Sequence, residues 1–442
     1  MIVLYLLISV LIIIFLTARL KVHPFIALLL VALLYGFASG MAPAEIIKSV
    51  NEGFGNTLGG IGLIIVLGVI IGAFLENTGG AYAIAEEILK ITGKKRVPSA
   101  MGLIGWFVSI PVFADSGFLL LSPLNRSLSK RAKISLAGSA IALALGLTAS
   151  HTMVPPTPGP IAAAGILGAD LGLVLAVGIP VSIIALIAGI VFASKYVART
   201  YIDPDPEISE QELRLKMQHA PGPFKSCIPV LVPILLIVLK SVVKTFDGND
   251  GFLVNAVLFA GEPFIALLIG VFLALLLPKK LEKKMLSTDG WIGKSLSGAA
   301  SIILITGAGG IFGKVLQNSG IADVLGGVLA GFHLSIWLPF LLAAAIKTAQ
   351  GSSTVALITT ASIMAPLMES LGFDQGLEKA MVVIAIGAGS AVVSHANDSF
   401  FWVVTQMSGM DTKTGYRMHT LGTFILGTTA ATVLFIAHLI LN

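Results

Sequence analysis

The sequence predicts an all-α polytopic membrane protein, an inverted repeat of two five-span halves that each contain a re-entrant hairpin and a broken helix. Composition, the length of the apolar runs and internal repeats lead to this fold class. Of the 442 residues, 56% are hydrophobic and 12% are charged, whereas a soluble domain carries about 25% charged residues. The composition therefore excludes a soluble protein.

The apolar segments are long enough for membrane helices. Four runs approach the roughly 20 residues that cross a bilayer as a helix. They are Ile2–Ala18, Pro24–Gly40, Phe252–Leu277 and Gly422–Leu441. A membrane β-barrel would instead show short segments of alternating hydrophobicity. The spans are therefore predicted to be helical.

The basic residues predict the orientation of the chain. Placing six loop regions in the cytoplasm puts 22 of the 28 Lys and Arg residues there, and positive charge marks cytoplasmic loops. These regions are 19–21, 90–96, 126–133, 195–225, 279–294 and 413–417. The asymmetry predicts that the N-terminus lies outside the cell.

The segment Val97–Asn125 predicts the first re-entrant hairpin. Basic clusters flank it on both sides, yet it is shorter than the roughly 40 residues that two crossings need. It should therefore enter and leave on the cytoplasmic side, with its turn at PVFADSGF (111–118). Such a turn must lie within protein or face a watery cavity, because lipid offers the backbone no hydrogen bonds.

Internal repeats divide the chain into two halves. HPFIALLL (23–30) recurs as EPFIALLI (262–269), LENTGG (75–80) as LQNSGI (316–321), and ASHT (149–152) as VSHA (393–396). Three collinear matches at nearly one offset indicate a duplication. The predicted units are a first membrane repeat (1–195), a cytoplasmic linker (196–225) and a second, inverted membrane repeat (226–442).

The count of spans predicts that the second half is inverted. Each half should contain three spans, the hairpin, an interrupted span and a final span, which makes five crossings. Because five is odd, the second hairpin, Trp337–Pro366 around KTAQGSST (347–354), enters from outside. Inverted repeats of this kind are typical of alternating-access transporters, whose substrate site lies between the halves near the midplane.

The interrupted spans and the hairpin tips carry the candidate binding groups. The prolines of GLTASHTMVPPTPGP (146–160) break a helix, because each ring removes a backbone donor and clashes with the preceding turn. Half-helix N-termini at such breaks suit a carboxylate, and the hydroxyls suit a polyhydroxy ligand. Alternatively, such Ser and Thr side chains bond back to helix carbonyls. The predicted substrate-binding residues are Ser116, Ser150, Thr157, Gly159, Lys347, Ser352, Ser353, Thr354, Ser394 and Asn397.

Four titratable residues are candidates for proton coupling. Asp115 and Asp398 could each bind and release a proton, since an unpaired charge at the bilayer centre costs at least about 3 kcal/mol. His151 and His395, which the repeat relates to each other, could relay protons or could be neutral rings that satisfy backbone carbonyls. Lys347 is placed at the mouth of the second hairpin, where it could attract an anionic substrate.

The sequence shows no sign of disulfides, metal sites, cofactor binding or nucleic-acid binding. The single Cys227 excludes intrachain disulfides and cysteine metal clusters, and no metal site is predicted. No Walker loop or dinucleotide fingerprint occurs between a strand and a helix, so no cofactor is expected. The net charge of +5 is assigned to cytoplasmic loops, and no nucleic-acid partner is expected.

Four motifs carry a family resemblance over nearly the whole chain. They are PPTPGP (155–160), ADLG (169–172), GSSTVALITTASIMAPL (351–367) and GAGSAVVSHANDSFFW (387–402). Together they resemble the gluconate permease family of bacterial gluconate:proton symporters, within the wider ion transporter superfamily. The chain departs from the family pattern at Thr157, where the family has His, and at Asp115, where it commonly has Glu.

The resemblance implies proton-coupled uptake of gluconate or a related small hydroxy-carboxylate, and no enzymatic activity. It also implies a homodimer in the bacterial cytoplasmic membrane, in which a mobile domain moves against a scaffold in an elevator-like manner. A sodium-coupled carboxylate symporter and a D-serine-type permease are alternatives. An intramembrane protease that uses Asp115 and Asp398 is a further alternative, although it leaves the duplication unexplained.

Overall fold

The computed structural model describes five stretches of the chain, and every regular element in them is a helix. The described stretches are residues 2–92, 96–204, 220–244, 251–321 and 335–441. Within these stretches, six helices are long and apolar enough to cross a membrane, or seven if one bent pair counts as a single span. The all-α prediction is confirmed for this part of the chain. Much of the predicted linker, residues 205–219, lies outside the described residues.

The first half is helical from its first spans to the linker. Its elements are α1 (Ile2–Ile14), η1 (Phe15–Arg19), α2 (Pro24–Ala38), α3 (Pro43–Asn77), α4 (Gly80–Thr92), α5 (Val97–Val108), α6 (Ala114–Arg131), α7 (Leu136–Met153), α8 (Pro158–Leu167), α9 (Leu171–Lys195) and η2 (Val197–Arg199). Proline stands at the start of α2, α3, α5 and α8. Its missing N–H does no harm there, because N–H groups in the first turn form no hydrogen bond within the helix.

The second half has a corresponding order of helices. Its elements are α11 (Pro223–Lys244), α12 (Phe252–Ala260), α13 (Pro263–Leu275), α14 (Lys283–Leu286), α15 (Trp291–Asn318), α17 (Trp337–Gln350), α18 (Ser353–Met364), η3 (Ala365–Leu367), α19 (Gly376–Ala391), α20 (Ser399–Met407), α21 (Thr412–Gly415), η4 (Tyr416–Thr420) and α22 (Leu421–Leu441).

The longest repeated segment marks a helix start in both halves. Pro24 begins α2 and Pro263 begins α13. The second of these starts divides the apolar run Phe252–Leu277, which is therefore not one continuous helix. Instead, α12 and α13 are separate helices bent by 72°. The helix cannot continue through Pro263, whose ring removes a backbone donor and clashes with the preceding turn.

All four predicted interruptions separate two helices in the structure. Residues 109–113 lie between α5 and α6, and residues 351–352 lie between α17 and α18. Residues 154–157 lie between α7 and α8, and residues 392–398 lie between α19 and α20. Three of these breaks fall within the segments that the sequence indicates. The first hairpin instead turns at residues 109–113, so Ala114–Phe118 of its predicted turn belong to α6.

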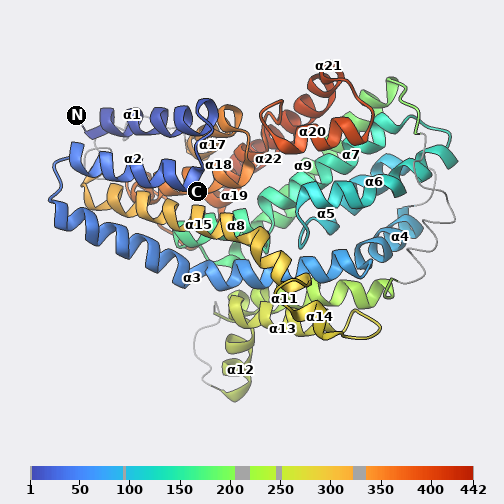
Figure 1. Cartoon of the computed structure of the whole chain (residues 1–442), viewed down its shortest axis with the longest axis horizontal. Coiled ribbons are helices and arrows are strands. Elements are labelled where there is room, and N and C mark those ends of the chain that lie inside the picture. Colours follow the sequence, from blue (N-terminus) through green and yellow to red (C-terminus); the bar gives the residue numbers. More distant parts are fainter. Residues whose placement is uncertain (1, 93–95, 205–219, 245–250, 322–334, 442) are drawn as a thin grey trace.

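The helices pair in corresponding ways in the two halves. α3 and α15 lie alongside each other (Figure 1). α8 packs on α18 and α6 packs on α20, while α5 packs on α7 and α17 packs on α19. α2 packs on α15, and α13 packs on α3. The contacts α5–α7 and α17–α19 each lie within one half, and the other five join the two halves.

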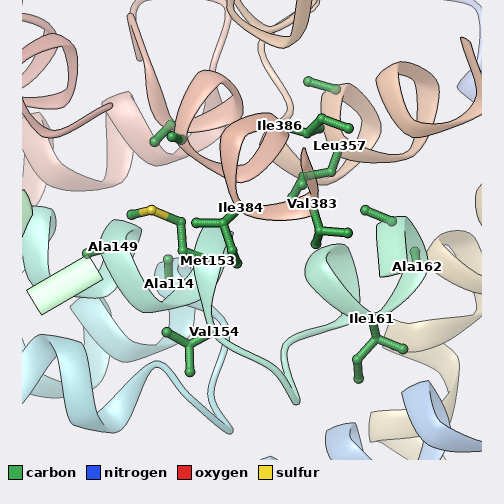
Figure 2. Close-up of a cluster of buried hydrophobic side chains, with 14 of the residues drawn as sticks. Ala114, Ala149, Met153, Val154, Ile161, Ala162, Leu357, Val383, Ile384 and Ile386 are labelled. Atoms are coloured by element: carbon green, nitrogen blue, oxygen red, sulfur yellow. The ribbon is translucent and has the colours of Figure 1, made fainter. Parts of the chain in front are cut away.

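Apolar side chains hold the interrupted helices together in a common core. Figure 2 shows Met153 and Val154 at the end of α7, Ile161 on α8, Leu357 on α18 and Ile384 on α19. All five are buried, with at most 1% of each exposed. Protein interiors packed in this way deform little, so this core fixes the helix breaks relative to one another.

Candidate functional site

The two hairpin tips, the end of α7 and the second helix break surround one polar cavity of about 340 Å³. It is lined by Phe113, Ala114, Asp115, Thr148, His151, Thr152, Ile302, Gln350, Gly351, Ser352, Ser353, Thr354, Ala391, Ser394, Asn397, Asp398, Ser399 and Phe400. Eight of the fourteen predicted site residues are in this lining. The structure therefore brings together residues that lie almost 300 positions apart in the sequence.

Three helices begin at the cavity. Asp115 lies in the first turn of α6, Ser353 is the first residue of α18, and Ser399 is the first residue of α20. The first turn of a helix carries unpaired N–H groups and the positive end of the helix dipole. Their convergence directs three positive dipole ends towards the cavity, a setting that favours a negatively charged group.

Asp115 lines the cavity, and one of its carboxyl oxygens is unpaired. Its Oδ1 is buried and has no hydrogen-bond partner in the described part of the chain. A buried polar atom without a partner is costly, so this oxygen is suited to receive a proton or a ligand group. Ser116 follows it in the same turn of α6 but is not in the cavity lining.

The tip of the second hairpin lies directly against the second helix break. Gly351 has a φ of +92°, a conformation that favours glycine, and a Cβ there would collide with the backbone of Asn397. The hydroxyl of Ser352 caps α18 by accepting a hydrogen bond from Val355 N at 3.3 Å. Thr354 lies in the first turn of α18 and faces the cavity.

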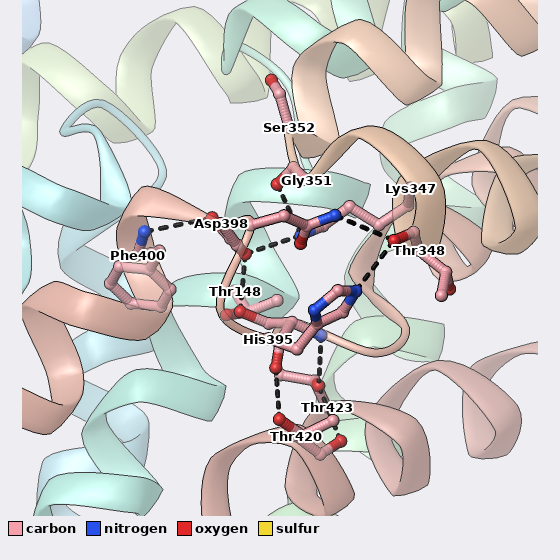
Figure 3. A network of polar contacts seen from close by, with 12 residues as sticks. Thr148, Lys347, Thr348, Gly351, Ser352, His395, Asp398, Phe400, Thr420 and Thr423 are labelled. Atoms are coloured by element: carbon pink, nitrogen blue, oxygen red, sulfur yellow. Dashed lines mark hydrogen bonds and ion pairs between the residues drawn. The ribbon is translucent and has the colours of Figure 1, made fainter. Parts of the chain in front are cut away.

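Lys347 and Asp398 form a buried ion pair, which corrects the predicted position of Lys347. Lys347 is fully buried, and its Nζ donates to Asp398 Oδ2 at 2.6 Å and to the carbonyl oxygen of Gly351 at 2.7 Å (Figure 3). Asp398 Oδ1 accepts from Phe400 N at 3.0 Å. Lys347 therefore lies behind the hairpin tip and holds it to the second break, instead of standing at a mouth.

The last span holds Ser394 by all three of its polar groups. Ser394 N donates to Thr423 Oγ1 at 3.1 Å, and its carbonyl oxygen accepts from Thr420 Oγ1 at 2.5 Å. Its Oγ lies 3.1 Å from His419 Nε2 and donates to Asp398 Oδ2 at 2.5 Å. His419 and Thr420 belong to the π-helical turn η4, a kind of turn often found at functional sites.

His395 and Asn397 brace the end of α17. His395 Nε2 lies 2.8 Å from the carbonyl oxygen of Thr348 (Figure 3), and Asn397 Nδ2 donates to the same oxygen at 2.9 Å. His395 is not in the cavity lining, whereas Asn397 is. The ring of His395 thus satisfies a backbone carbonyl, which was the alternative to a proton relay.

The predicted residues of the first break serve mainly in packing. Ser150 Oγ donates to the carbonyl oxygen of Gly146 at 3.5 Å, and Thr157 Oγ1 donates to that of Val154 at 2.7 Å. A Cβ on Gly159 would lie 2.6 Å from Leu357 Cδ1 on α18. These three residues do not line the cavity, because the prolines turn this break into the core. His151 does line it, and its Nδ1 has no hydrogen-bond partner among the described residues.

Comparison with known proteins identifies the family. A family model described as GntP family permease matches residues 1–440. The chain belongs to the GntP permease family. It is similar to a gluconate permease of Pseudomonas aeruginosa, with 36% identity over 446 residues that cover 98% of this chain and 97% of the relative. It is also similar to the D-serine transporter DsdX of Escherichia coli, with 32% identity over 440 residues that cover 99% and 98%.

A solved structure shares the fold of this GntP family permease. The YdaH transporter of Alcanivorax borkumensis matches with a TM-score of 0.61 and 13% sequence identity, over 94% of this chain and 98% of the other. The predicted family and the prediction of a transporter are confirmed, and the protein is a multi-pass membrane protein. The protease alternative is wrong, because permeases are transporters and not enzymes.

Several residues at the site of this permease escaped the sequence motifs. Thr148 and Thr152 line the cavity with His151, and helical spacing from His151 would have found Thr148. No motif points to His419, which is fully buried and meets Ser394 from 25 positions further along the chain. Only the packing of the last span against the second break reveals it.

Proposed function

We propose that this GntP family permease is a secondary active symporter that carries a small hydroxy-carboxylate such as gluconate into the cell with a proton. The observation that supports it most is the composition of the cavity. Helix N-termini, hydroxyl-bearing residues and Asp115, which has an unpaired carboxyl oxygen, line one space of about 340 Å³. The N-termini suit a carboxylate, the hydroxyls suit a polyol chain, and the acid suits a proton.

The chemistry of the cavity also defines a second candidate. Gluconate and D-serine, after which two relatives are named, share a carboxylate and at least one hydroxyl group. D-serine adds an ammonium group, and Asp115 would be its partner in the cavity. A D-serine-type permease therefore uses the same residues but gives Asp115 a different role.

We assign proton coupling to Asp115 in preference to Asp398. Asp398 accepts hydrogen bonds from Lys347, Ser394 and Phe400, and these contacts stabilise its charged form. Asp115 has no ion pair in the described part of the chain, so its charge is the more costly of the two to bury. A proton on Asp115 would offset the charge of the anion during transport.

We propose the inverted repeat as the architecture for this transport. The N-terminus lies outside, the first hairpin opens to the cytoplasm, and the second opens to the exterior. Corresponding helix contacts in the two halves, such as α8 on α18 and α6 on α20, support a two-fold relation. The substrate cavity then lies at the meeting point of the halves, as in other transporters with inverted repeats.

We further propose an elevator-like movement and an inward-facing state. The arms α8 and α18, on the outer side in this topology, pack on α3 and α15, whereas α6 and α20 pack on each other and on α7. Ile61, near the middle of α3, contacts Gly165 at the outer end of α8. The unit of hairpins, broken helices and final spans is therefore displaced towards the cytoplasm, relative to a scaffold in which α2 and α13 pack on α15 and α3.

The decisive experiment is uptake into proteoliposomes that contain the purified permease. We expect an inward proton gradient to drive accumulation of labelled gluconate without sodium, and a protonophore to abolish it. Competition by glycerate, other sugar acids and D-serine separates the two candidates. Accumulation that requires sodium and resists the protonophore would contradict proton coupling, and competition by D-serine alone would favour the second candidate.

We also propose a homodimer in the bacterial cytoplasmic membrane. This expectation comes from the family resemblance, and a transport unit that moves against a scaffold benefits from a scaffold anchored by a second copy. Light scattering of the purified protein in detergent measures the mass of the complex. A mass of one chain would contradict the dimer.

A further inference from the structure

A second cavity of about 330 Å³ adjoins the substrate cavity, and Phe113 lines both. Phe113 immediately precedes α6 at the tip of the first hairpin. On the side of the substrate cavity its ring meets the ring of His151, with centroids 6.1 Å apart. Phe113 thus borders two spaces of nearly equal volume.

The second cavity lies between the hairpin tip and the scaffold. Its walls come from residues 69–77 of α3, 291–298 of α15 and 111–113 of the tip. Gly72 seats the tip on α3, because a Cβ at this position would collide with the carbonyl oxygen of Pro111. In the proposed topology these ends of α3 and α15 face the cytoplasm.

The walls carry groups that bind a hydroxylated anion. Lys294 and Ser295 line the cavity from α15, and Asn77 lines it from α3. Lys294 forms no ion pair among the described residues, so its ammonium group remains available to a carboxylate. Glu76 lies on the opposite wall, and its like charge keeps such an anion on the α15 side.

The opposite ends of α3 and α15 also surround a cavity, but it differs in the ion pairing of its lysine and in its relation to the substrate cavity. A third cavity there, of about 300 Å³, contains Lys314 and Glu52. Lys314 Nζ lies 3.9 Å from Glu52 Oε2 and donates to Gln317 Oε1 at 3.2 Å. This cavity shares none of its lining residues with the substrate cavity in the described part of the chain. Among the described residues, a lysine without an ion pair and a lining residue shared with the substrate cavity thus occur together at the cytoplasmic ends of α3 and α15 and not at their opposite ends.

We propose that the second cavity is a transit site for the carboxylate substrate on its way to the cytoplasm, with Phe113 as the side chain that separates it from the substrate cavity. Lys294 binds the carboxylate there, while Ser295 and Asn77 bind hydroxyl groups. This inference rests on the proposed function and its topology. It adds a binding site to that function, on the cytoplasmic side only.

Transport kinetics measured separately from each side test the role of Lys294. With Lys294→Gln in proteoliposomes of one orientation, we expect the gluconate concentration for half-maximal transport from the cytoplasmic side to rise about tenfold, the loss of roughly 1.4 kcal/mol of binding. The value from the outer side stays unchanged. Lys314→Gln is the matched control and leaves the cytoplasmic value unchanged. A Lys294→Gln protein with wild-type values on both sides would overturn the proposal.

Thiol labelling tests the site without depending on turnover. In a Cys227→Ala background, Ser295→Cys places the reactive thiol in the cavity, and Ser297→Cys places it on the exposed side of the same helix. We expect gluconate to slow maleimide labelling at position 295 and not at 297. Equal rates at position 295 with and without gluconate would overturn the transit site, while proton-driven uptake by the same protein would leave the proposed function standing. Failure of the wild-type protein to accumulate gluconate would instead contradict the function itself.

Discussion

Two carboxyl groups line the polar cavity, and their surroundings differ. Asp398 is tied to Lys347, Ser394 and Phe400 by hydrogen bonds of 2.5 to 3.0 Å. Asp115 Oδ1 has no hydrogen-bond partner in the described part of the chain. A sequence alone ranks the two acids equally, because it does not show that Lys347 reaches one of them and not the other.

Replacing Asp115 should separate proton coupling from substrate movement. We expect Asp115→Asn to lose proton-driven accumulation of gluconate while it retains exchange of labelled for unlabelled gluconate, because the amide carries no proton across. Asp411→Asn is the control, since Asp411 is an exposed helix cap and Asn caps helices equally well. Normal accumulation by Asp115→Asn would exclude this residue as the coupling acid.

The ion pair between Lys347 and Asp398 should act mainly through stability. Removing one partner of a buried pair leaves an uncompensated charge and costs about 3–5 kcal/mol. We therefore expect Lys347→Met and Asp398→Asn each to lower the thermal unfolding temperature of the purified protein. The double variant should regain most of that loss, because it leaves no buried charge. Single variants as stable as the wild type would show that the pair does not hold the hairpin tip.

At the scale of elements, the seam between α8 and α18 depends on Gly159. A Cβ at this position would lie 2.6 Å from Leu357 Cδ1, so we expect Gly159→Val to destabilise the protein by about 1–3 kcal/mol through overpacking. Gly55→Val is the matched control, because no atom lies within 4 Å of a Cβ at Gly55. Unfolding of the purified variants by heat measures the difference.

A second substitution distinguishes packing from substrate binding at this seam. Gly159→Val combined with Leu357→Ala should recover stability and gluconate affinity together, because the smaller side chain makes room for the valine. If the double variant recovered stability but not gluconate affinity, the result would support the predicted substrate-binding role of Gly159.

The sequence locates helix breaks well where proline or glycine causes them. The prolines of the first break and Gly351 of the second hairpin act on their own backbone, so the breaks that they cause can be recognised in the sequence. Pro263 carries the same signal, but the apolar run around it concealed the 72° bend. The π-helical turn that holds Ser394 leaves no comparable signature, because its place depends on contacts with the second break.

At the scale of the whole molecule, repeats in the sequence predict which helices correspond but not which helices touch. Corresponding pairs do form, as with α8 on α18 and α6 on α20. In the described residues, α8 and α18 also pack on the long helices α3 and α15, whereas α6 and α20 also pack on α7. Apolar helix faces of similar composition fit one another in several ways, so no local pattern selects this arrangement.

A disulfide across this asymmetric contact tests the elevator-like movement. A Cβ on Gly165 of α8 would lie 3.3 Å from the Cβ of Ile61 on α3, close to the roughly 3.8 Å of a disulfide. In a Cys227→Ala background, we expect oxidation of the Ile61→Cys, Gly165→Cys variant to stop gluconate uptake, because α8 can no longer leave α3. Reduction should restore uptake.

The matching control is a cross-link within the unit that is proposed to move. A Cβ on Gly189 of α9 would lie 3.5 Å from the Cβ of Leu145 on α7, and both helices belong to that unit. Oxidation of the Gly189→Cys, Leu145→Cys variant should leave uptake intact, because the two helices travel together. If uptake survived complete cross-linking of α3 to α8, the two helices would not separate during transport. The asymmetry would then be a permanent property of the fold, and the substrate would have to reach the two sides by movement of the hairpin tips alone.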